Sequence, residues 1–97
     1  MAVVAITTGL SLAQHLAVKQ RVHDLYGPVP GQLLQVCCGE GEDLLVITVY
    51  EAEADYDTFT QTVLAKVLAD LRYADIPYQS QVLPAHDVTV ERLLANV

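Results

Sequence analysis

Two apolar segments flank an acidic, glycine-containing turn and predict a central β-hairpin. The segments are residues 33–38 and 44–50, and the turn is Gly39-Glu40-Gly41-Glu42-Asp43, in which glycine permits positive φ and the acids favour contact with water. Successive side chains of a strand point to opposite faces. In the second segment both sets are largely apolar: Leu45, Ile47 and Val49 on one face, and Leu44, Val46, Thr48 and Tyr50 on the other. Both faces of the predicted sheet therefore need to be covered.

Two further strands are predicted outside this hairpin. Residues 2–8 are rich in Val, Ile and Thr, which favours a strand, and residues 78–88 form another extended segment. Pro84 interrupts the second of these segments. Because proline lacks the N–H that a ladder hydrogen bond requires, we expect this strand at an edge of the sheet. The two prolines before the hairpin also suit an edge position for its first strand.

Two helices are predicted between the strands. Ser11 followed by Gln14 fits a capping box, so the first helix is expected over residues 12–26, where a Gly-Pro pair ends it. The second helix is expected over about residues 53–73, with acidic side chains at its start, where the helix dipole favours negative charge. Its apolar residues recur at helical spacing, which indicates that one side packs against the sheet.

The resulting order, strand–helix–strand–strand–helix–strand, predicts an α+β fold in a single domain covering residues 1–97. The simplest packing is the ferredoxin-like arrangement, a four-stranded antiparallel sheet with both helices on one face. Because those helices can cover only one face, we expect a second copy of the chain to cover the other. The prediction is a homodimer in which two sheets meet face to face around a barrel-like interior, a dimeric α/β barrel.

The first predicted helix carries polar groups within its apolar side. At 100° per residue, its apolar arc contains Leu12, Leu16, Val18, Val22 and Leu25, and its wet face contains Ala13, Gln14, Ala17, Gln20, Arg21 and Asp24. His15, Lys19 and Tyr26 fall near the middle of the apolar arc, and His23 lies toward its edge. Snorkelling of Lys19 and hydrogen bonding of the others within a core would explain this pattern. A ligand cavity beside the helix is the other explanation.

Composition and charge exclude several classes of partner. The chain is 53% hydrophobic and has a formal net charge of −7, so nucleic acid and anionic membranes would be repelled. The apolar start, residues 1–6, is far shorter than a signal-peptide core or a membrane span, and we expect a soluble, cytoplasmic protein. The adjacent Cys37 and Cys38 leave opposite faces of a strand, so we interpret them as small buried thiols in a reducing compartment.

Several short motifs between about residues 28 and 87 carry a family resemblance. They are Pro30-Gly31, Val49-Tyr50-Glu51-Ala52, Tyr56-Asp57, Phe59 and Pro84-Ala85-His86-Asp87. In these motifs the chain resembles the dimeric α/β-barrel superfamily, and more narrowly the small antibiotic-biosynthesis-monooxygenase-like proteins. Tyr50 keeps an aromatic residue and His86 is retained, whereas Gln35 stands where a His is common and Thr48 where an Asp is common. The resemblance implies a ligand pocket between sheet and helices.

The function that the resemblance implies is cofactor-independent chemistry on an apolar, oxygenated aromatic or polyketide-like molecule, as a monooxygenase, cyclase or isomerase. His86 would be the general base and Tyr50 the hydrogen-bond donor to a carbonyl or enolate oxygen, with His15, His23 and Tyr26 contacting the substrate. A histidine near its ordinary pKa can accept a proton at neutral pH, and a tyrosine hydroxyl can stabilise an enolate oxygen.

Two alternatives remain open. The first is a non-catalytic dimeric module that binds a small ligand in the same pocket. The second is a haem or metal binder. His15 and His23 are eight residues apart in one helix, which separates them by about 12 Å along the axis, too far for both to bind one ion.

Overall fold

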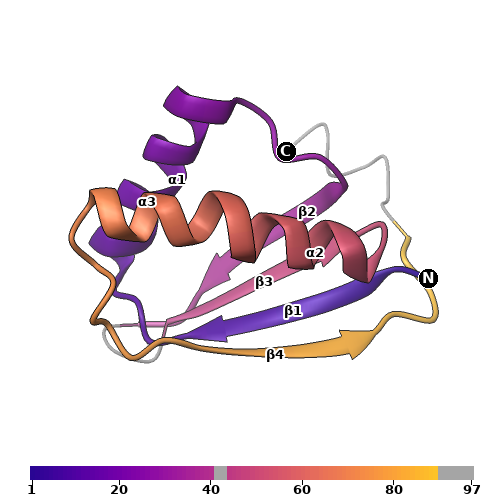
Figure 1. Ribbon diagram of the computed structural model, residues 1–97. Coiled ribbons are helices and arrows are strands. Elements are labelled where there is room, and N and C mark those ends of the chain that lie inside the picture. Colours follow the sequence, from indigo (N-terminus) through magenta and orange to yellow (C-terminus); the bar gives the residue numbers. More distant parts are fainter. Residues whose placement is uncertain (41–43, 90–97) are drawn as a thin grey trace, which may run out of the picture.

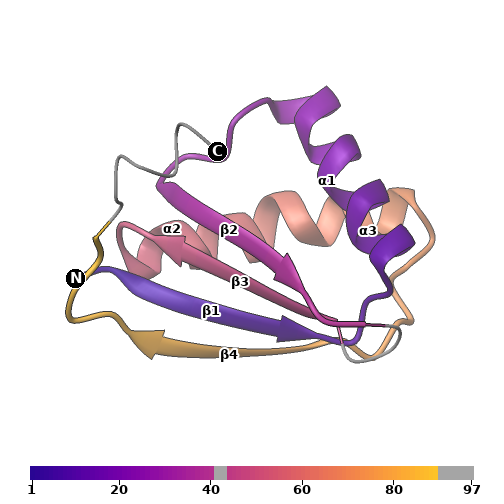
Figure 2. The same cartoon turned by 180° about the vertical axis from the view of Figure 1, so that it is seen from behind.

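The computed structural model describes residues 1–40 and 44–89 of the chain and has the predicted α+β architecture (Figure 1). Its elements are β1 (Val3–Thr8), α1 (Leu12–Tyr26), β2 (Gln32–Cys38), β3 (Leu45–Tyr50), α2 (Glu53–Thr58), η1 (Phe59–Leu64), α3 (Ala65–Asp70) and β4 (Gln79–Pro84). The strands form one antiparallel sheet in the order β2-β3-β1-β4. All helices lie on one side of the sheet, as Figures 1 and 2 show from opposite directions. The predicted ferredoxin-like fold is confirmed.

Both strands next to prolines lie at edges of the sheet, as predicted. β2 forms one edge and β4 the other. β4 ends at Pro84, opposite Val3, so the predicted strand over residues 78–88 was too long at its C-terminal end. The amide of Ala85 still donates a hydrogen bond of 2.9 Å to the carbonyl oxygen of Ala2. Because Ala85 and Ala2 form the hydrogen-bonded pair, the nitrogen of Pro84 faces away from β1 toward the open edge of the sheet, where no N–H is required.

The local signals at the ends of α1 are confirmed. The amide of Gln14 donates to Ser11 Oγ at 3.1 Å, and the amide of Ser11 donates to Gln14 Oε1 at 2.9 Å, which completes the capping box. Gly27 follows the helix with a φ of 72°, a value that favours glycine. In the hairpin turn Gly39 has a φ of 106°, as predicted. The remaining turn residues, 41–43, and the helical turn predicted at 91–97 lie outside the described residues.

The second helix contains a turn that the sequence did not predict. The helical run begins at Glu53 and ends at Asp70, about three residues before its predicted end. Its middle, Phe59–Leu64, is a π-helix, in which hydrogen bonds join residues five apart rather than four. The hydroxyl of Thr60 donates to the carbonyl oxygen of Tyr56 at 3.0 Å, within the same region. A single π turn rotates the side chains that follow it, so it changes which residues face the sheet.

The core lies between the helices and the sheet in two clusters. Val18 and Val22 of α1 pack with Val67 and Leu68 of α3. The second cluster contains Val3, Ala5 and Tyr50 from the sheet. No described helix is long and apolar enough to cross a membrane.

The opposite side of the sheet is largely apolar, with Thr8, Gln79 and Gln81 as polar members, and it is covered by no described element. It carries Val4 and Ile6 of β1, Leu34 and Val36 of β2, Leu45, Ile47 and Val49 of β3, and Leu83 of β4. The exposed fractions of Leu34, Val36 and Leu83 are 41%, 43% and 42%. We call these eight residues the open face. Residues 44–50 therefore place apolar side chains on both faces of the sheet, as predicted.

Two details of burial differ from the sequence predictions. Of the predicted apolar arc of α1, only Val18 and Val22 are buried, together with His15. Leu12 and Leu16 are about half exposed, at 51% and 52%. Cys38 was expected to be buried but is exposed, since it ends an edge strand, and both cysteines are free thiols.

Candidate functional site

A cavity of about 220 Å³ separates α1 and the second helical run from the sheet. Its walls come from β1, β2, β3, β4, α1, α2 and η1 and from the segment that joins α1 to β2. The polar or aromatic residues of its lining are Thr7, His15, Lys19, His23, Gln32, Gln35, Thr48, Tyr50, Tyr56, Phe59, Thr60 and Ser80. Aliphatic lining residues include Ala5, Leu10, Val18, Val22, Val29, Val46 and Leu64. The site is thus apolar with a limited number of directed polar groups, as is typical of small-molecule pockets.

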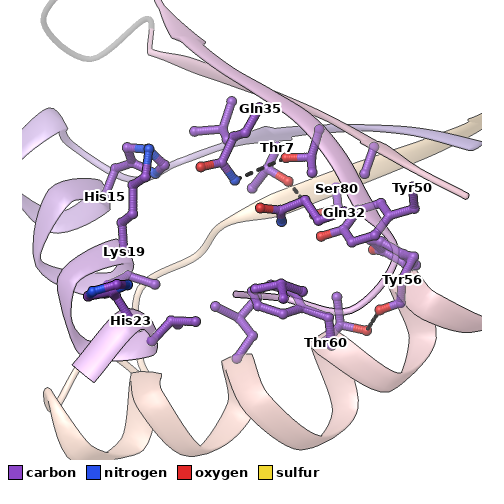
Figure 3. Close-up of a pocket in the computed structure, with 18 of the residues that line it drawn as sticks. Thr7, His15, Lys19, His23, Gln32, Gln35, Tyr50, Tyr56, Thr60 and Ser80 are labelled. Carbon is purple, nitrogen blue, oxygen red and sulfur yellow. Dashed lines mark hydrogen bonds between the residues drawn. The ribbon is translucent and has the colours of Figure 1, made fainter. Parts of the chain in front are cut away.

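One wall of the cavity is the polar stripe of α1. His15, Lys19 and His23 recur at intervals of four residues, which places them one above another on the same side of a helix. Figure 3 shows all three side chains directed into the cavity. His15 is buried, with 6% of its surface exposed, whereas Lys19 and His23 are exposed. The stripe therefore runs from the interior of the cavity to its mouth.

The opposite wall is formed by the aromatic end of β3. Tyr50 is 3% exposed, and its ring contacts Tyr56 edge to face, with ring centres 5.7 Å apart and planes at 77°. Phe59, the first residue of the π turn, lies with its ring centre 6.3 Å from that of Tyr50. This packing holds the Tyr50 ring in place because edge-to-face aromatic pairs have a preferred geometry.

The sheet contributes a floor of small hydrogen-bonded side chains. Gln35 Nε2 donates to Thr48 Oγ1 at 3.2 Å, between neighbouring strands β2 and β3. The hydroxyl groups of Thr7 and Ser80 lie 2.9 Å apart, between β1 and β4. In the part of the chain that the structure describes, no buried side-chain nitrogen or oxygen lacks a hydrogen-bond partner. Polar groups of the cavity are therefore either paired or accessible from its interior.

Burial changes the acid–base properties of the two titratable groups deepest in the cavity. It lowers the pKa of His15, and the positive charge of Lys19 lowers this pKa further. The imidazole is consequently neutral at neutral pH. Burial raises the pKa of Tyr50, a hydrogen bond from the side chain of Gln32 lowers it in part, and Tyr56 adds a further increase. Tyr50 therefore keeps its proton, so the cavity presents a neutral base and a protonated hydroxyl.

The structure brings together some of the predicted site residues and separates others. His15, His23 and Tyr50 line the same cavity. Tyr26 lines a second cavity of about 280 Å³ on the other side of Val29 and Phe59. His86 is exposed, lies beyond the end of β4, and is not among the lining residues of either cavity.

Several lining residues were not predicted as site residues from the sequence. Lys19 was placed within the apolar arc, and its spacing from His15 and His23 was the available signal. Tyr56 and Phe59 were assigned to core packing, and their proximity to Tyr50 had no signal in the sequence. Gln32, Thr60 and Ser80 carried no signal either, because register, the π turn and the strand order decide their placement.

The predicted metal alternative gains no support from the side chains. Within residues 1–40 and 44–89, no group of three or more His, Cys, Asp or Glu side chains is arranged to hold a metal ion. His15 and His23 share a wall of the cavity, but His86 does not line it.

Comparison with known proteins gives matches in structure and none in sequence. No protein-family model matches the chain, and no curated protein matches it. A protein of unknown function from Nitrosomonas europaea, NE2512, superposes with a TM-score of 0.62 at 11% identity, over 93% of each chain. A Deinococcus radiodurans protein assigned to the antibiotic biosynthesis monooxygenases gives a TM-score of 0.62 at 11% identity, over 94% of this chain and 98% of that one. SnoaB from Streptomyces nogalater, a cofactor-independent oxygenase, superposes with a TM-score of 0.56 at 18% identity, over 93% of this chain and 96% of that one.

The chain has the fold of the antibiotic-biosynthesis-monooxygenase-like proteins. The resemblance found in the sequence motifs is thus confirmed for the fold. Because the identities are 11–18%, the comparison establishes the architecture alone.

Proposed function

We propose that the chain binds a small, apolar, oxygenated aromatic or polyketide-like molecule in this cavity and acts on it without a cofactor, as a monooxygenase, cyclase or isomerase. The observation that carries the proposal is the placement of His15 and Tyr50 in one apolar cavity. The pKa of His15 is lowered and that of Tyr50 is raised, so a neutral base and a neutral hydrogen-bond donor line the same space. Pairs of titratable groups whose pKa values are shifted apart are typical of acid–base sites.

The first step would be the same for each of these reactions. The neutral imidazole of His15 would accept a proton from a carbon next to a carbonyl group or from a phenol, and the Tyr50 hydroxyl would donate a hydrogen bond to the oxygen that gains negative charge. The resulting enolate can cyclise or be reprotonated elsewhere. In the oxygenase case the substrate itself reduces O2. A CH2 group becomes C=O with one oxygen atom, and the second oxygen atom leaves as water with the two hydrogens.

His86 remains the second candidate for the base, as the sequence motifs suggest. Its exposed position outside the cavity makes His15 the better candidate within one chain. That position also favours the alternative of a non-catalytic module, in which the cavity binds a ligand and the motif that contains Pro84 and His86 only ends the edge strand.

The open face supports the proposal that two chains associate through their sheets. Eight apolar side chains from all four strands share that face, and three of them are more than 40% exposed. Exposed apolar surface of this kind is covered in stable proteins. A second copy with the same face would cover it symmetrically.

The experiment compares ligand binding and turnover in matched variants. Native mass spectrometry and thermal shift with aromatic polyketides should detect binding, and an oxygen electrode with product analysis should detect reaction. A general base contributes about 10²–10⁴-fold to the rate, so His15→Gln should lose most turnover while still binding ligand. His86→Ala should then retain turnover. The reverse result would assign the base role to His86, binding without turnover in the unmodified protein would favour the non-catalytic module, and a Soret band in the purified protein would indicate haem.

A further inference from the structure

The charge distribution around the cavity differs sharply from that of the whole chain. The chain has twelve acidic and five Lys or Arg residues. The cavity lining, drawn from the described residues, contains Lys19 and two of the three histidines but no Asp or Glu. The acidic side chain of α1, Asp24, accepts a hydrogen bond from Gln20 at 2.8 Å and is absent from the lining. A strongly acidic protein therefore has a cavity whose charged groups are basic.

Lys19 is placed to act on a ligand rather than on another side chain. The one ion pair within the described ranges joins Arg21 and Asp70, 3.8 Å apart, on a different side of α1. The ammonium group of Lys19 thus has no carboxylate partner there, and Figure 3 shows its chain extending along the cavity wall between His15 and His23. Its charge acts inside the cavity, because it contributes to the lowered pKa of the buried His15.

We propose that the ligand of this cavity carries an anionic oxygen group, a carboxylate on an aromatic ring, which Lys19 and His23 bind at the mouth while the ring packs between Val46 and Phe59. This inference rests on the proposed function, since it names the class of molecule that the same cavity takes. An ammonium–carboxylate contact at about 2.8 Å is a strong hydrogen bond. Other acidic side chains more than about 8 Å away are screened at physiological ionic strength, so the local contact decides the sign of the interaction.

The polarity along the stripe explains why the anion belongs at the mouth. Lys19 and His23 are exposed, so binding an anion there does not require a charge to be moved into the apolar interior. His15, Tyr50 and the aromatic wall lie deeper and offer neutral donors and acceptors to an uncharged part of the ligand. A ligand with a carboxylate at one end and an aromatic ring with ketone or hydroxyl groups at the other matches this order.

The test uses 2-naphthoate and 2-naphthamide, two probes of the same shape that differ in charge. We expect the unmodified protein to bind naphthoate about tenfold more tightly than naphthamide by isothermal titration calorimetry, which corresponds to one charge-assisted hydrogen bond. Lys19→Met, which keeps the apolar stem and leaves His23 in place, should remove most of this preference without weakening naphthamide binding, and Lys19→Arg should restore it. Lys66→Met, at an exposed position of α3 outside both cavities, is the matched control and should change neither affinity.

The outcomes separate this inference from the proposed function. Equal affinity for both probes, or an equal loss for both in Lys19→Met, would overturn the anionic ligand and leave the apolar cavity in place. Absence of binding by both probes at millimolar concentration would overturn the cavity as an aromatic-ligand site and the inference with it. A second readout is the His15 imidazole in NMR titrations, whose pKa should rise when naphthoate is bound and stay unchanged with naphthamide.

Discussion

The two sides of the sheet are built from the same four strands, yet they have different surroundings. On the side that faces the helices, Val46, Thr48 and Tyr50 are buried and line the cavity. On the open face, Leu45, Ile47 and Val49 alternate with them, and their neighbours Leu34, Val36 and Leu83 are exposed. The helix-facing side of the sheet carries hydroxyl and amide groups, whereas all eight residues of the open face are Val, Leu or Ile.

This difference separates a surface for association from a surface for chemistry. A largely apolar face gains free energy mainly by being covered, and a matching apolar surface can do so. A cavity with directed donors and acceptors favours a ligand whose polar atoms meet them, because an unpaired buried polar group is costly. We therefore expect substitutions on the open face to affect assembly and substitutions around the cavity to affect ligands and local stability.

The largest effect is expected for Ile47→Asp, on the open face. If two sheets meet there, this change buries an uncompensated charge, which costs about 3–5 kcal/mol. Light scattering coupled to gel filtration should show a shift from dimer to monomer or loss of soluble protein. Gln61→Asp adds a similar charge at an exposed position of η1 and should leave assembly unchanged. A monomer at micromolar concentration in the unmodified protein would contradict the proposed dimer directly.

A loss of folding stability is expected for Tyr50→Ala, on the helix-facing side of the sheet. Removing a buried aromatic ring typically lowers the free energy of unfolding by about 3–5 kcal/mol. Here the change also removes the ring contacts with Tyr56 and Phe59. Denaturant unfolding should show the loss. Tyr50→Phe keeps the ring and should remain within about 1.5 kcal/mol of the unmodified protein, while losing the hydroxyl that we assign to the substrate oxygen. A Tyr50→Phe variant with full turnover would rule out that assignment.

A smaller effect, dependent on pH, is expected from His15. Its pKa in the folded protein is below the value of about 6.5 for an unfolded histidine. Between those two values the unfolded chain binds more protons, so stability falls as pH decreases from about 7 toward the folded pKa. The melting temperature of His15→Gln should therefore fall less steeply with acidification than that of the unmodified protein. The charged or titratable groups that line the cavity with His15 are Lys19, His23, Tyr50 and Tyr56, and all are retained in this comparison. Parallel curves for the two proteins would show that His15 is not held neutral by the cavity.

The smallest expected effect is on the titration of His15 itself when Lys19 is changed. Lys19→Met removes the positive charge that lowers the pKa of His15, so this pKa should rise, although burial still keeps it below the ordinary value. NMR titration of the imidazole resonances measures this directly. Lys66→Met should not move it, because Lys66 lies outside the cavity. An unchanged His15 pKa in Lys19→Met would show that the two side chains do not interact across the stripe.

Much of the fold could be predicted because its signals are local. The capping box at Ser11 and Gln14, the helix end at Gly27 and the edge positions next to prolines depend on neighbouring residues or on the chemistry of one residue. The site was predicted only in part. His15, His23 and Tyr50 line one cavity, whereas Tyr26 lines a different cavity and His86 lies outside both. The catalytic roles of His86 and Tyr50 and the substrate contacts of His15, His23 and Tyr26 stay predictions.

The sequence by itself determined the order of the elements, the alternation that makes both sides of β3 apolar, and the polar stripe within the apolar arc of α1. These follow from the fixed periods of helices and strands, which require no knowledge of distant contacts. Only the tertiary structure decided that Leu12 and Leu16 are half exposed rather than in the core. It also decided that Phe59 and Thr60 of the π turn line the cavity and that Tyr50 faces His15 across it. Those facts depend on how α1 is set against the sheet and on strand register, and both are fixed by packing between residues far apart in the chain.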